Sequence, residues 1–326
     1  MGVTTKDLAK ICGVSRTTVT RALYGGSIRD DTKNRILETA QALGYQPDLL
    51  ARSLVKGTSM TIGVIVVDLR NQYFPKMLDA IENTLKEYNY LLNITLHENS
   101  RETEQRLLQE LIGHRVDGLI ISPANQDRDF WEYLKNIPVP VVVIGNNLGD
   151  GISTVGIDEE QATSDAVSFI LNKNYQNIVF VVPPLSNCND PGNIGHRQRV
   201  VGYSKAMKAS GLPEQLILGS DYIEQVLDYM KNCTQRPAFL CSGDTYAIEV
   251  LSTLRQAGFT EVKDFGIMGF DCIDILQKWS PVLTTVDNHV EQIGRQSAEL
   301  LLELISEKSI RKSIKIPHNM VSGETI

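Results

Sequence analysis

Apolar and polar positions at the start of the chain follow the period of short α-helices. The first helix is predicted to begin after Thr4 or Thr5, whose hydroxyl groups are suited to capping it. Its inner side carries Leu8, Ala9 and Ile11. Gly13 then interrupts the pattern, and glycine can adopt the positive φ that a tight turn between two helices needs. The pattern therefore predicts a helix, a sharp turn and a further helix.

The second short helix is predicted to have Ser15 as its cap. Its inner face consists of Val19, Ala22 and Leu23, and its outer face of Arg16, Thr17, Thr20 and Arg21. Two crossing helices joined by a glycine turn are typical of a helix-turn-helix. The basic outer face has two interpretations: it is the solvated side of an ordinary helical hairpin, or it enters the major groove of DNA. In that groove an arginine can form two hydrogen bonds with guanine, and a threonine methyl can contact thymine.

A third helix is predicted from Lys33 to Leu43, and Gly44 ends it. Its candidate caps are Asp30, Asp31 and Thr32, and its expected core positions are Ile36, Leu37, Ala40 and Leu43. Beyond it, Pro47 suits the first position of a helix and Gly57 suits a helix end. The segment between them is too short to persist as a helix alone in water, so a linker with incidental helix propensity is the alternative.

From Thr61 onward, short apolar runs alternate with amphipathic stretches. The apolar runs are Ile62 to Val67, Gly118 to Ser122, Val139 to Gly145, Ile178 to Pro183, Ala238 to Ser242 and Phe265 to Phe270. The helical stretches between them include Met77 to Tyr88, Thr103 to His114, Gln161 to Lys173, Arg197 to Ser210 and Tyr246 to Gly258. This alternation predicts parallel sheets covered by helices on both faces. There are enough strands for two such units, one before about residue 158 and one after it.

Charge is unevenly distributed along the 326 residues, a length that suits two or three domains. The formal net charge of −7 argues against a polyanionic partner for the chain as a whole. Residues 1–58, however, contain nine Lys and Arg and five Asp and Glu, a net charge of +4, which leaves −11 for the remainder. A basic head on an acidic body is expected when only the head binds nucleic acid.

Motifs for export, membrane insertion and enzymatic chemistry are missing from the sequence. The five cysteines are odd in number and scattered, which is typical of reduced residues in a cytosolic protein: Cys12, Cys188, Cys233, Cys241 and Cys272. The N-terminus has no signal-peptide core, and no apolar run is as long as a membrane span. Phosphate-binding, dinucleotide-binding and Gly-x-Ser-x-Gly motifs are also missing. We therefore expect a cytoplasmic protein with no cofactor, no metal and no enzymatic activity.

Polar residues that follow the predicted strands are the candidates for a ligand site, because ligands bind beyond the carboxyl ends of parallel strands. They are Asp68, Asn125, Asn146, Asp158, Asp244 and Asp271. Tyr73 and Phe74 follow the first strand and could stack on a sugar ring, and Arg197 begins the helix after the loop 187–195. Each residue also has a structural explanation: an aspartate can cap a helix or bridge two lobes, and Tyr73 can belong to the core.

Two segments carry a resemblance to a known family. VTTKDLAKICGVSRTTVTRAL and GYQPDLLARSLVKGTSMTIGVIV resemble the DNA-binding head and hinge of the lactose, galactose and purine repressor (LacI/GalR) family, and the resemblance extends along the whole chain. It implies a homodimer that binds double-stranded, palindromic operator DNA. Residues implied to contact DNA are Thr4, Ser15, Arg16, Thr17, Thr18, Thr20 and Arg21 in the head, and Ala51, Ser53 and Leu54 in a hinge helix. In the hinge, Leu54 would be inserted between base steps of the minor groove, and the helix would fold only on DNA.

The resemblance also implies a ligand cleft between two lobes of periplasmic-binding-protein type. The implied ligand-binding residues are Asp68, Tyr73, Phe74, Asn125, Asn146, Arg197, Tyr222, Asp244, Asp271 and Asn288. Arg197 and Asp271 are the leading candidates, because a paired arginine and aspartate can bind vicinal hydroxyls. A sugar or sugar-like effector is expected. The segment 183–193 is longer and more polar than is usual in the family.

The expected architecture is a small all-α helix-turn-helix head followed by an α/β body with two doubly wound parallel-sheet lobes. The expected domains are a head at 1–46, a hinge at 47–58 and a body at 59–326. Lobe 1 would comprise about 60–157 and 289–316, and lobe 2 about 158–288 and 317–326. The expected function is a ligand-responsive transcriptional regulator, most simply a repressor. A metabolic enzyme with a helix-turn-helix head, or a sugar-binding body without regulatory coupling, is the alternative.

Overall fold

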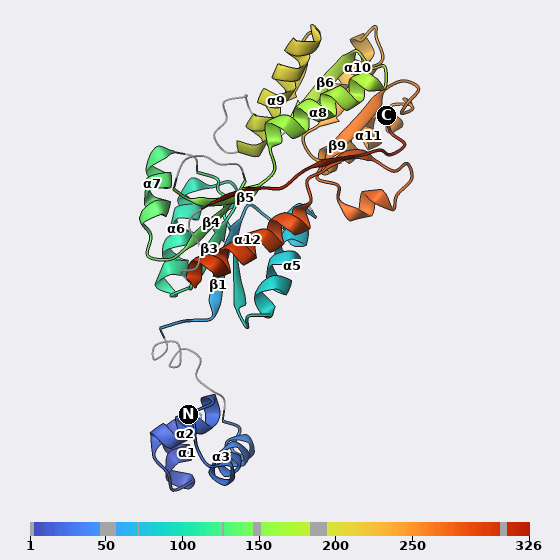
Figure 1. Ribbon diagram of the computed structural model, residues 1–326. Helices are drawn as coiled ribbons and strands as arrows, with labels where there is room; N and C mark the ends of the chain where they lie inside the picture. The colour runs from blue at the N-terminus through green and yellow to red at the C-terminus, as the bar shows by residue number, and fades with distance from the viewer. Residues whose placement is uncertain are drawn as a thin grey trace. The chain divides into compact units, whose positions relative to one another are not determined.

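The computed structural model describes residues 3–45, 57–70, 72–125, 127–145, 151–182, 194–306 and 312–326. The chain divides into two compact units, Met1–Ser59 and Met60–Ile326, which are described separately below (Figure 1). Four residues predicted to bind DNA or ligand lie outside the described residues: Ala51, Ser53, Leu54 and Asn146.

The head is a three-helix unit of α1 (Thr5–Ile11), α2 (Arg16–Tyr24) and α3 (Asp30–Ala42). Thr4 and Asp7 cap α1 reciprocally: the Asp7 amide donates to Thr4 Oγ1 at 3.3 Å and the Thr4 amide donates to Asp7 Oδ2 at 3.0 Å. Ser15 caps α2, accepting from the Thr18 amide at 3.1 Å. Gly13 has a φ of +61°, which confirms the predicted turn between α1 and α2.

The core of the head differs from the predicted core at three positions. Leu8, Val19 and Ile36 are fully buried, as expected. Ile11, however, is 59% exposed, because α1 ends there and Cys12, four residues after Leu8, takes the inward position. On the third helix, Leu37 and Leu43 are exposed.

The geometry of α3 accounts for these exposed leucines. Leu37 lies about 100° around the helix from the buried Ile36. Leu43 lies at the C-cap, beyond the last helical residue. The helix begins at Asp30, three residues earlier than predicted, and no side chain caps it.

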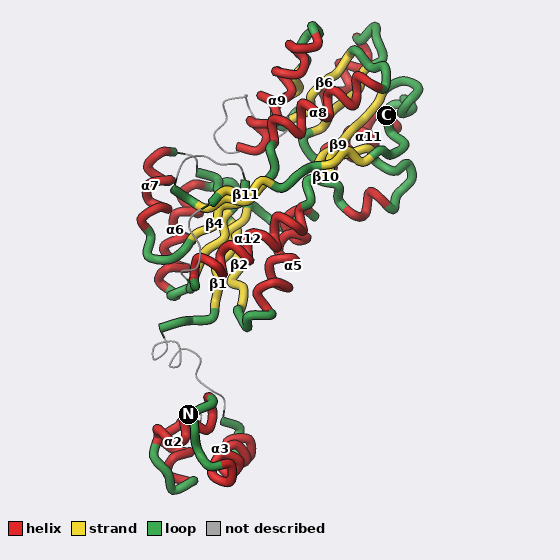
Figure 2. The backbone as a smooth tube through the Cα atoms, in the orientation of Figure 1, coloured by secondary structure: helices red, strands yellow, loops and turns green. Residues whose placement is uncertain are grey.

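The first lobe of the body contains a six-stranded sheet in the order β11-β5-β4-β3-β1-β2, in which every pair is parallel. Its strands are β1 (Thr61–Val66), β2 (Leu91–Leu96), β3 (Gly118–Ile121), β4 (Val141–Ile144), β5 (Ser153–Gly156) and β11 (Ser313–Lys315). Its helices are α5 (Tyr73–Lys86), α6 (Arg101–Gly113), α7 (Arg128–Asn136) and α12 (Val290–Ile305). Ile62, Val64 and Val66 share one cluster with α5 and α12, while Ile65 packs with α6 and α7, so the sheet is covered on both faces (Figure 2).

The second lobe repeats this plan with the strand order β12-β10-β9-β8-β6-β7. Its strands are β6 (Asn177–Val182), β7 (Leu216–Leu218), β8 (Pro237–Cys241), β9 (Gly266–Phe270), β10 (Thr284–Asp287) and β12 (Asn319–Val321). Its helices are α8 (Glu159–Asn172), α9 (Ile194–Ser210), α10 (Tyr222–Asn232), α11 (Asp244–Gln256) and the short 3-10 helix η1 (Asp274–Gln277). Only β12 among the described strands pairs antiparallel, with β10. Two parallel-sheet lobes confirm the predicted fold class, apart from that edge strand.

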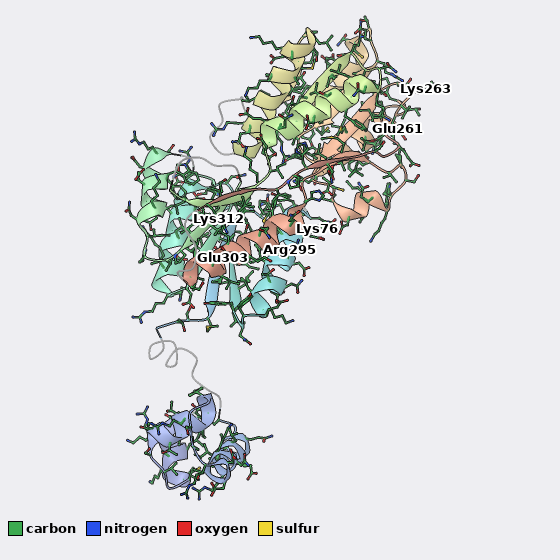
Figure 3. All side chains as sticks on the ribbon, in the orientation of Figure 1. Lys76, Glu261, Lys263, Arg295, Glu303 and Lys312 are labelled. Atoms are coloured by element: carbon green, nitrogen blue, oxygen red, sulfur yellow. The ribbon has the colours of Figure 1, made fainter. Side chains whose placement is uncertain are left out.

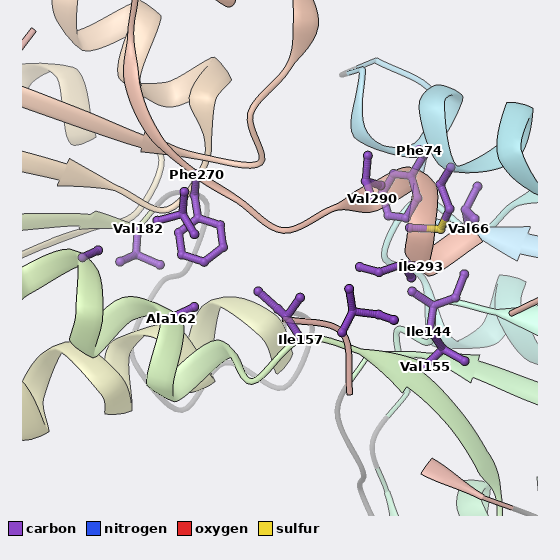
Figure 4. Close-up of a cluster of buried hydrophobic side chains, with 14 of the residues drawn as sticks. Val66, Phe74, Ile144, Val155, Ile157, Ala162, Val182, Phe270, Val290 and Ile293 are labelled. Atoms are coloured by element: carbon purple, nitrogen blue, oxygen red, sulfur yellow. The ribbon is translucent and has the colours of Figure 1, made fainter. Parts of the chain in front are cut away.

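Three segments connect the lobes: the chain runs from β5 into α8, from β10 into α12, and from β11 into β12. As the resemblance implied, α12 returns to the first lobe, where it packs on α5. The apolar core continues through these crossings. Figure 4 shows Ile157 between Val66 and Ile144 of the first lobe and Val182 and Phe270 of the second. None of the described helices is both long and apolar enough to cross a bilayer.

Candidate functional site

The outward side of α2 is the candidate DNA-binding face. Arg16, Thr17, Thr20 and Arg21 are all exposed there, while Thr18 is half-buried. The sequence from Gly13 to Arg29 contains no acidic residue, so α2 itself contributes no carboxylate that would repel phosphate. The N-terminus of α2 is the positive end of its helix dipole, which favours an anion.

Local contacts position the basic side chains of this face. Thr20 donates its hydroxyl hydrogen to the Arg16 carbonyl at 3.0 Å, so its methyl group and not its O–H is left for base contact. The loop after α2 packs against the stem of Arg21: a Cβ on Gly26 would lie 2.5 Å from Arg21 Cγ. Gly26 therefore allows Arg21 to lie against the backbone, which restricts the directions in which its guanidinium can point.

The body contains a cleft between its lobes, with a cavity volume of about 410 Å³, at the carboxyl ends of the parallel strands. The first lobe lines it with Val67, Asp68, Arg70, Tyr73, Phe74, Asn99, Ser122, Pro123, Ile144 and Gly145. The second lobe lines it with Glu159, Gly195, His196, Arg199, Ser242, Gly243, Thr245, Tyr246 and Asp271. Both lobes therefore contribute polar and aromatic groups to one cavity, as hydroxyl-rich ligands require.

Arg199 is the central side chain of the second lobe's wall and is only 6% exposed. Its Nε donates to Glu159 Oε2 at 2.7 Å, its Nη2 lies 3.5 Å from Asp271 Oδ1, and its Nη1 donates to the Ser242 carbonyl. The guanidinium carbon also lies 3.5 Å from the centroid of the Phe270 ring. Three strand or helix ends thus meet at one buried cation.

Close packing of α8 on α9 brings Arg199 to Glu159. A Cβ on Gly202, which lies one turn after Arg199, would be 2.2 Å from the carbonyl oxygen of Glu160. Only glycine allows the two helices to approach this far. The consequence is a short, buried, charge-assisted hydrogen bond between Arg199 and Glu159.

Asp271 follows β9 and faces Arg199. It has a φ of +107°, a strained conformation for a residue with a side chain, and such outliers concentrate at ligand sites. Burial raises the pKa of the Asp271 carboxyl to about 7, although Arg199 opposes the shift. Asn288 donates to Asp271 Oδ1 at 3.0 Å from behind the cleft.

Asp244 supports the Asp271 loop from below and does not line the cleft. Its Oδ2 accepts from the Ile273 amide at 2.8 Å and its Oδ1 from Thr285 Oγ1 at 2.5 Å. A Cβ on Gly269 would lie 2.1 Å from Asp244 Oδ1, so glycine makes room for the carboxylate. Burial raises the pKa of Asp244 to about 8. This geometry gives Asp244 a structural role.

The aromatic residues of the cleft come from both lobes. Tyr73 and Phe74 form an edge-to-face pair with centroids 5.0 Å apart on the first turn of α5. Across the cleft, Tyr246 contacts His196 at a centroid distance of 6.1 Å. Tyr222 packs behind Tyr246 at 6.0 Å and does not itself line the cleft. The two aromatic groups can therefore contact opposite faces of a ring.

Asn125 also has a structural function in place of the expected contact with ligand. Its Oδ1 accepts from the Asp127 amide, and its own amide donates to Glu104 Oε2, both at 2.9 Å. Glu104 is fully buried, and burial raises the pKa of its carboxyl to about 7. These bonds shape the loop after β3, and Asn125 does not line the cleft.

The arginine beside Asp271 in the cleft is Arg199 and not Arg197, for which this pairing was expected. Two residues along a helix correspond to a rotation of about 200°, so Arg197 and Arg199 point to nearly opposite sides of α9. Arg197 is half-buried, and its Nε makes no hydrogen bond within the described part of the chain. The prediction therefore identified the correct helix, α9, but the wrong arginine on it. It also missed Glu159, Tyr246 and His196.

Comparisons with known proteins agree along the whole chain. The model of bacterial regulatory proteins of the lacI family matches residues 4–48, and the model of periplasmic binding proteins and the sugar binding domain of the LacI family matches residues 59–324. Catabolite control protein A of Priestia megaterium is 31% identical, with 98% of each chain covered. The transcriptional repressor PurR of Photobacterium profundum is 27% identical, with 96% of this chain and 98% of that protein covered.

Solved structures show the same fold. The lac repressor dimer bound to operator and the anti-inducer ONPF superimposes with a TM-score of 0.88 at 22% identity, covering 100% of this chain and 99% of that chain. A LacI family regulator from Enterococcus faecium with bound ribose gives a TM-score of 0.71 at 25% identity, covering 81% and 98%. The relatives are transcriptional regulators and not enzymes, which confirms that expectation. The chain belongs to the LacI family of bacterial transcriptional regulators, with a helix-turn-helix DNA-binding head and a sugar-binding-type body.

Proposed function

We propose that the chain acts in the bacterial cytoplasm as a homodimeric repressor of an inverted-repeat operator, and that a carbohydrate-type ligand in the cleft controls its affinity for DNA. The observation that carries the proposal is the cleft itself. Arg199 and Asp271 present a donor and an acceptor side by side, and Tyr73 and Tyr246 face the cavity from opposite lobes. Hydrogen-bonding groups beside aromatic surfaces suit a hydroxylated ring.

Sugar ligands of similar proteins support this assignment. Besides the Enterococcus faecium regulator with ribose, a related protein from Alkaliphilus metalliredigens was solved with D-xylulofuranose, with a TM-score of 0.70 at 23% identity. For this chain we infer the same class of ligand. Release from DNA is the expected response to a sugar.

Exposed apolar side chains in both lobes of the body support a homodimer. Leu91 and Ile94 of the edge strand β2 are 63% and 43% exposed, and Trp279, just after η1, is 61% exposed. The ion pair of Lys76 Nζ with Asp274 Oδ1, at 2.7 Å, holds η1 against α5 (Lys76 is labelled in Figure 3). An edge strand with apolar side chains is a pairing surface in need of cover. A two-fold axis there would require a palindromic operator.

The DNA contacts follow from the exposed face of α2 and from the hinge. We propose that Arg16, Thr17 and Arg21 contact bases in the major groove and that Thr4, Ser15, Thr18 and Thr20 lie near the phosphates. Ala51, Ser53 and Leu54 would act in the minor groove, with Leu54 as the wedge. Because the hinge segment lies between the head and the first lobe, ligand binding in the cleft could change the spacing at which two hinges pair.

Selection of duplexes from a randomised library by the full chain, followed by fluorescence anisotropy, tests this function. The selected duplexes should be inverted repeats. Arg16→Ala should relax base preference, costing about 1–3 kcal/mol at one position of each half-site. Arg35→Ala removes the same charge from an exposed site on α3 and should leave base preference unchanged. Selection of no inverted repeat, or equal base discrimination in Arg16→Ala and the wild type, would contradict the proposal.

A further inference from the structure

Carboxylates outnumber cations among the charged groups of the cleft that are not well solvated. Arg199 is the buried cation, and two carboxylates, Glu159 and Asp271, are paired with it. Asp68 of the first lobe adds a third carboxylate to the lining, where its Oδ1 accepts from the Arg70 amide at 2.8 Å. Apart from Arg70, the charged groups in the lining of the cleft are therefore one cation and three carboxylates.

Arg70 at the cleft margin does not correct this imbalance. Its Nη2 lies 3.6 Å from Glu98 Oε1, and the two side chains are 73% and 65% exposed. An arginine this well solvated, with a carboxylate beside it, contributes little positive potential. His196 adds no charge either, because burial and then Arg199 lower the pKa of its imidazole to about 3.

The segments next to the cleft in sequence supply no further cation. Residues 146–150 follow Gly145, and residues 183–193 precede Gly195, and both glycines line the cleft. Neither segment contains Lys, Arg or His. Protonation of Asp271 would reduce the negative charge by one, and the carboxylate of Asp68 would still leave an excess.

We propose that the effector is a hydroxylated ring that bears a protonated amine, in chemical terms an amino sugar, and that the cleft rejects phosphorylated sugars. This inference rests on the proposed function, because it assumes that the cleft is the effector site. The hydroxyl groups bind Arg199 and Asp271, and the ammonium group lies toward Asp68. Among the described residues that line the cleft, a phosphate ester would find no buried cation without carboxylate partners, and it would meet the carboxyl groups of Asp68, Glu159 and Asp271, which is costly in a partly desolvated cleft.

Closure of the cleft gives the amine a regulatory consequence. Asp68 belongs to the first lobe, whereas Glu159 and Asp271 belong to the second, so closing the lobes brings like charges together. A cation between them relieves that repulsion in the closed state more than in the open state. A ligand changes a conformational equilibrium only through such a difference in affinity, so the amine is suited to drive closure.

Calorimetric titration of the full chain with matched series of sugars tests the proposal. One series is glucosamine, glucose and glucose 6-phosphate, and a second is the corresponding galactose series. In at least one series the amino sugar should bind about tenfold more tightly than the neutral sugar, the usual effect of a charge-assisted hydrogen bond. The phosphate ester should not bind. Asp68→Asn should abolish the preference for the amine, while Asp129→Asn, an exposed carboxylate on α7, should preserve it.

The outcomes separate this inference from the proposed function. Binding of the phosphate ester, an equal or higher affinity for the neutral sugar in both series, or no binding by any member would overturn the inference. Arg199→Lys keeps the positive charge but cannot form the paired hydrogen bonds of a guanidinium. It should therefore weaken the binding of every sugar that occupies the cleft. If ligand binding is unchanged in Arg199→Lys, the ligand occupies another site and the proposed function itself fails.

Discussion

Replacement of Arg199 by alanine should destabilise the second lobe strongly and should also abolish ligand binding. The guanidinium holds Glu159 at 2.7 Å and Asp271 at 3.5 Å, and all three side chains are largely buried. In Arg199→Ala, two carboxylates would remain in the wall of the cleft without their counter-charge. Their mutual repulsion and their poor solvation both act on the folded state only.

The expected loss is about 3–5 kcal/mol, the usual cost of leaving a buried charge without its partner. Loss of the contact between Arg199 and the Phe270 ring adds to it. For a body of this size, the loss corresponds to a decrease of roughly 6–20 °C in Tm. The decrease should be smaller at about pH 5 than at about pH 8. At lower pH, protonation of Asp271, whose pKa burial already raises to about 7, removes one of the unpaired charges.

Calorimetry of the full chain at both pH values measures these effects, with Arg197→Ala as the matched control. Arg197 is two residues away on the same helix and forms no ion pair among the described residues, so its replacement leaves no carboxylate there without a partner and should cost less than about 1 kcal/mol. In the Arg199→Ala background, Asp271→Asn should recover part of the lost stability, whereas in the wild type it should destabilise. Equal Tm values for the two arginine variants, or additive effects of Arg199→Ala and Asp271→Asn, would refute this account of the charge cluster.

Three further changes probe the head and the first lobe. Ile36→Ala removes a fully buried side chain and should cost the head about 2–5 kcal/mol, so that operator binding is lost in anisotropy measurements while ligand binding persists. Gly26→Ala places a Cβ 2.5 Å from Arg21 Cγ and should weaken operator binding about tenfold with little change in helicity by circular dichroism. The buried Glu104, whose pKa is raised from 4.5 to about 7, penalises the folded state increasingly as pH rises between those values. Glu104→Gln should therefore flatten the decline in urea-unfolding free energy over that range, by up to about 3 kcal/mol, and an unchanged slope would contradict the assignment.

Local sequence signals predicted the head well, because short helices are specified by their own caps and turns. Thr4, Ser15 and Gly13 act as predicted. The errors at Ile11 and Leu43 both lie at helix ends, where the inward direction depends on how the chain leaves the helix. The direction in which the chain leaves a helix depends on tertiary packing, and no periodic pattern in the sequence encodes it.

In the body, the sequence revealed the strands that are apolar runs, and it missed the edge strands as well as the interior strands β5 and β10, which contain serine or threonine. β1, β3 and β8 are continuous apolar runs, because both faces of each are covered. β2 lies at the sheet edge with Leu91 and Ile94 exposed, and β12 has only three residues, so neither stands out from its surroundings. The fold class could thus be predicted without a complete strand inventory.

The sequence predicted site residues that lie at the ends of strands. It missed several site residues that lie on helices, because their direction depends on which face of the helix packs inward. Asp271 is the first residue after β9 and Asp68 the second after β1, and both line the cleft. Arg199 could have been found from periodicity, since it falls on the same buried stripe of α9 as Tyr203 and Ala206, four and seven residues later. Glu159 carries no such signal, because its contact with Arg199 depends on the close approach of α8 and α9 at Gly202.

Thermodynamic linkage between the cleft and the operator is the most direct test of the central claim that one chain couples the two sites. The tightest-binding sugar should be titrated into the full chain alone and into the complex of the chain with a selected inverted-repeat duplex, which gives its affinity in both states. The affinity for the operator should then be measured with and without that sugar. The account predicts that both affinities change by the same factor, about 5- to 150-fold. Identical sugar affinities in the presence and absence of the operator would contradict it.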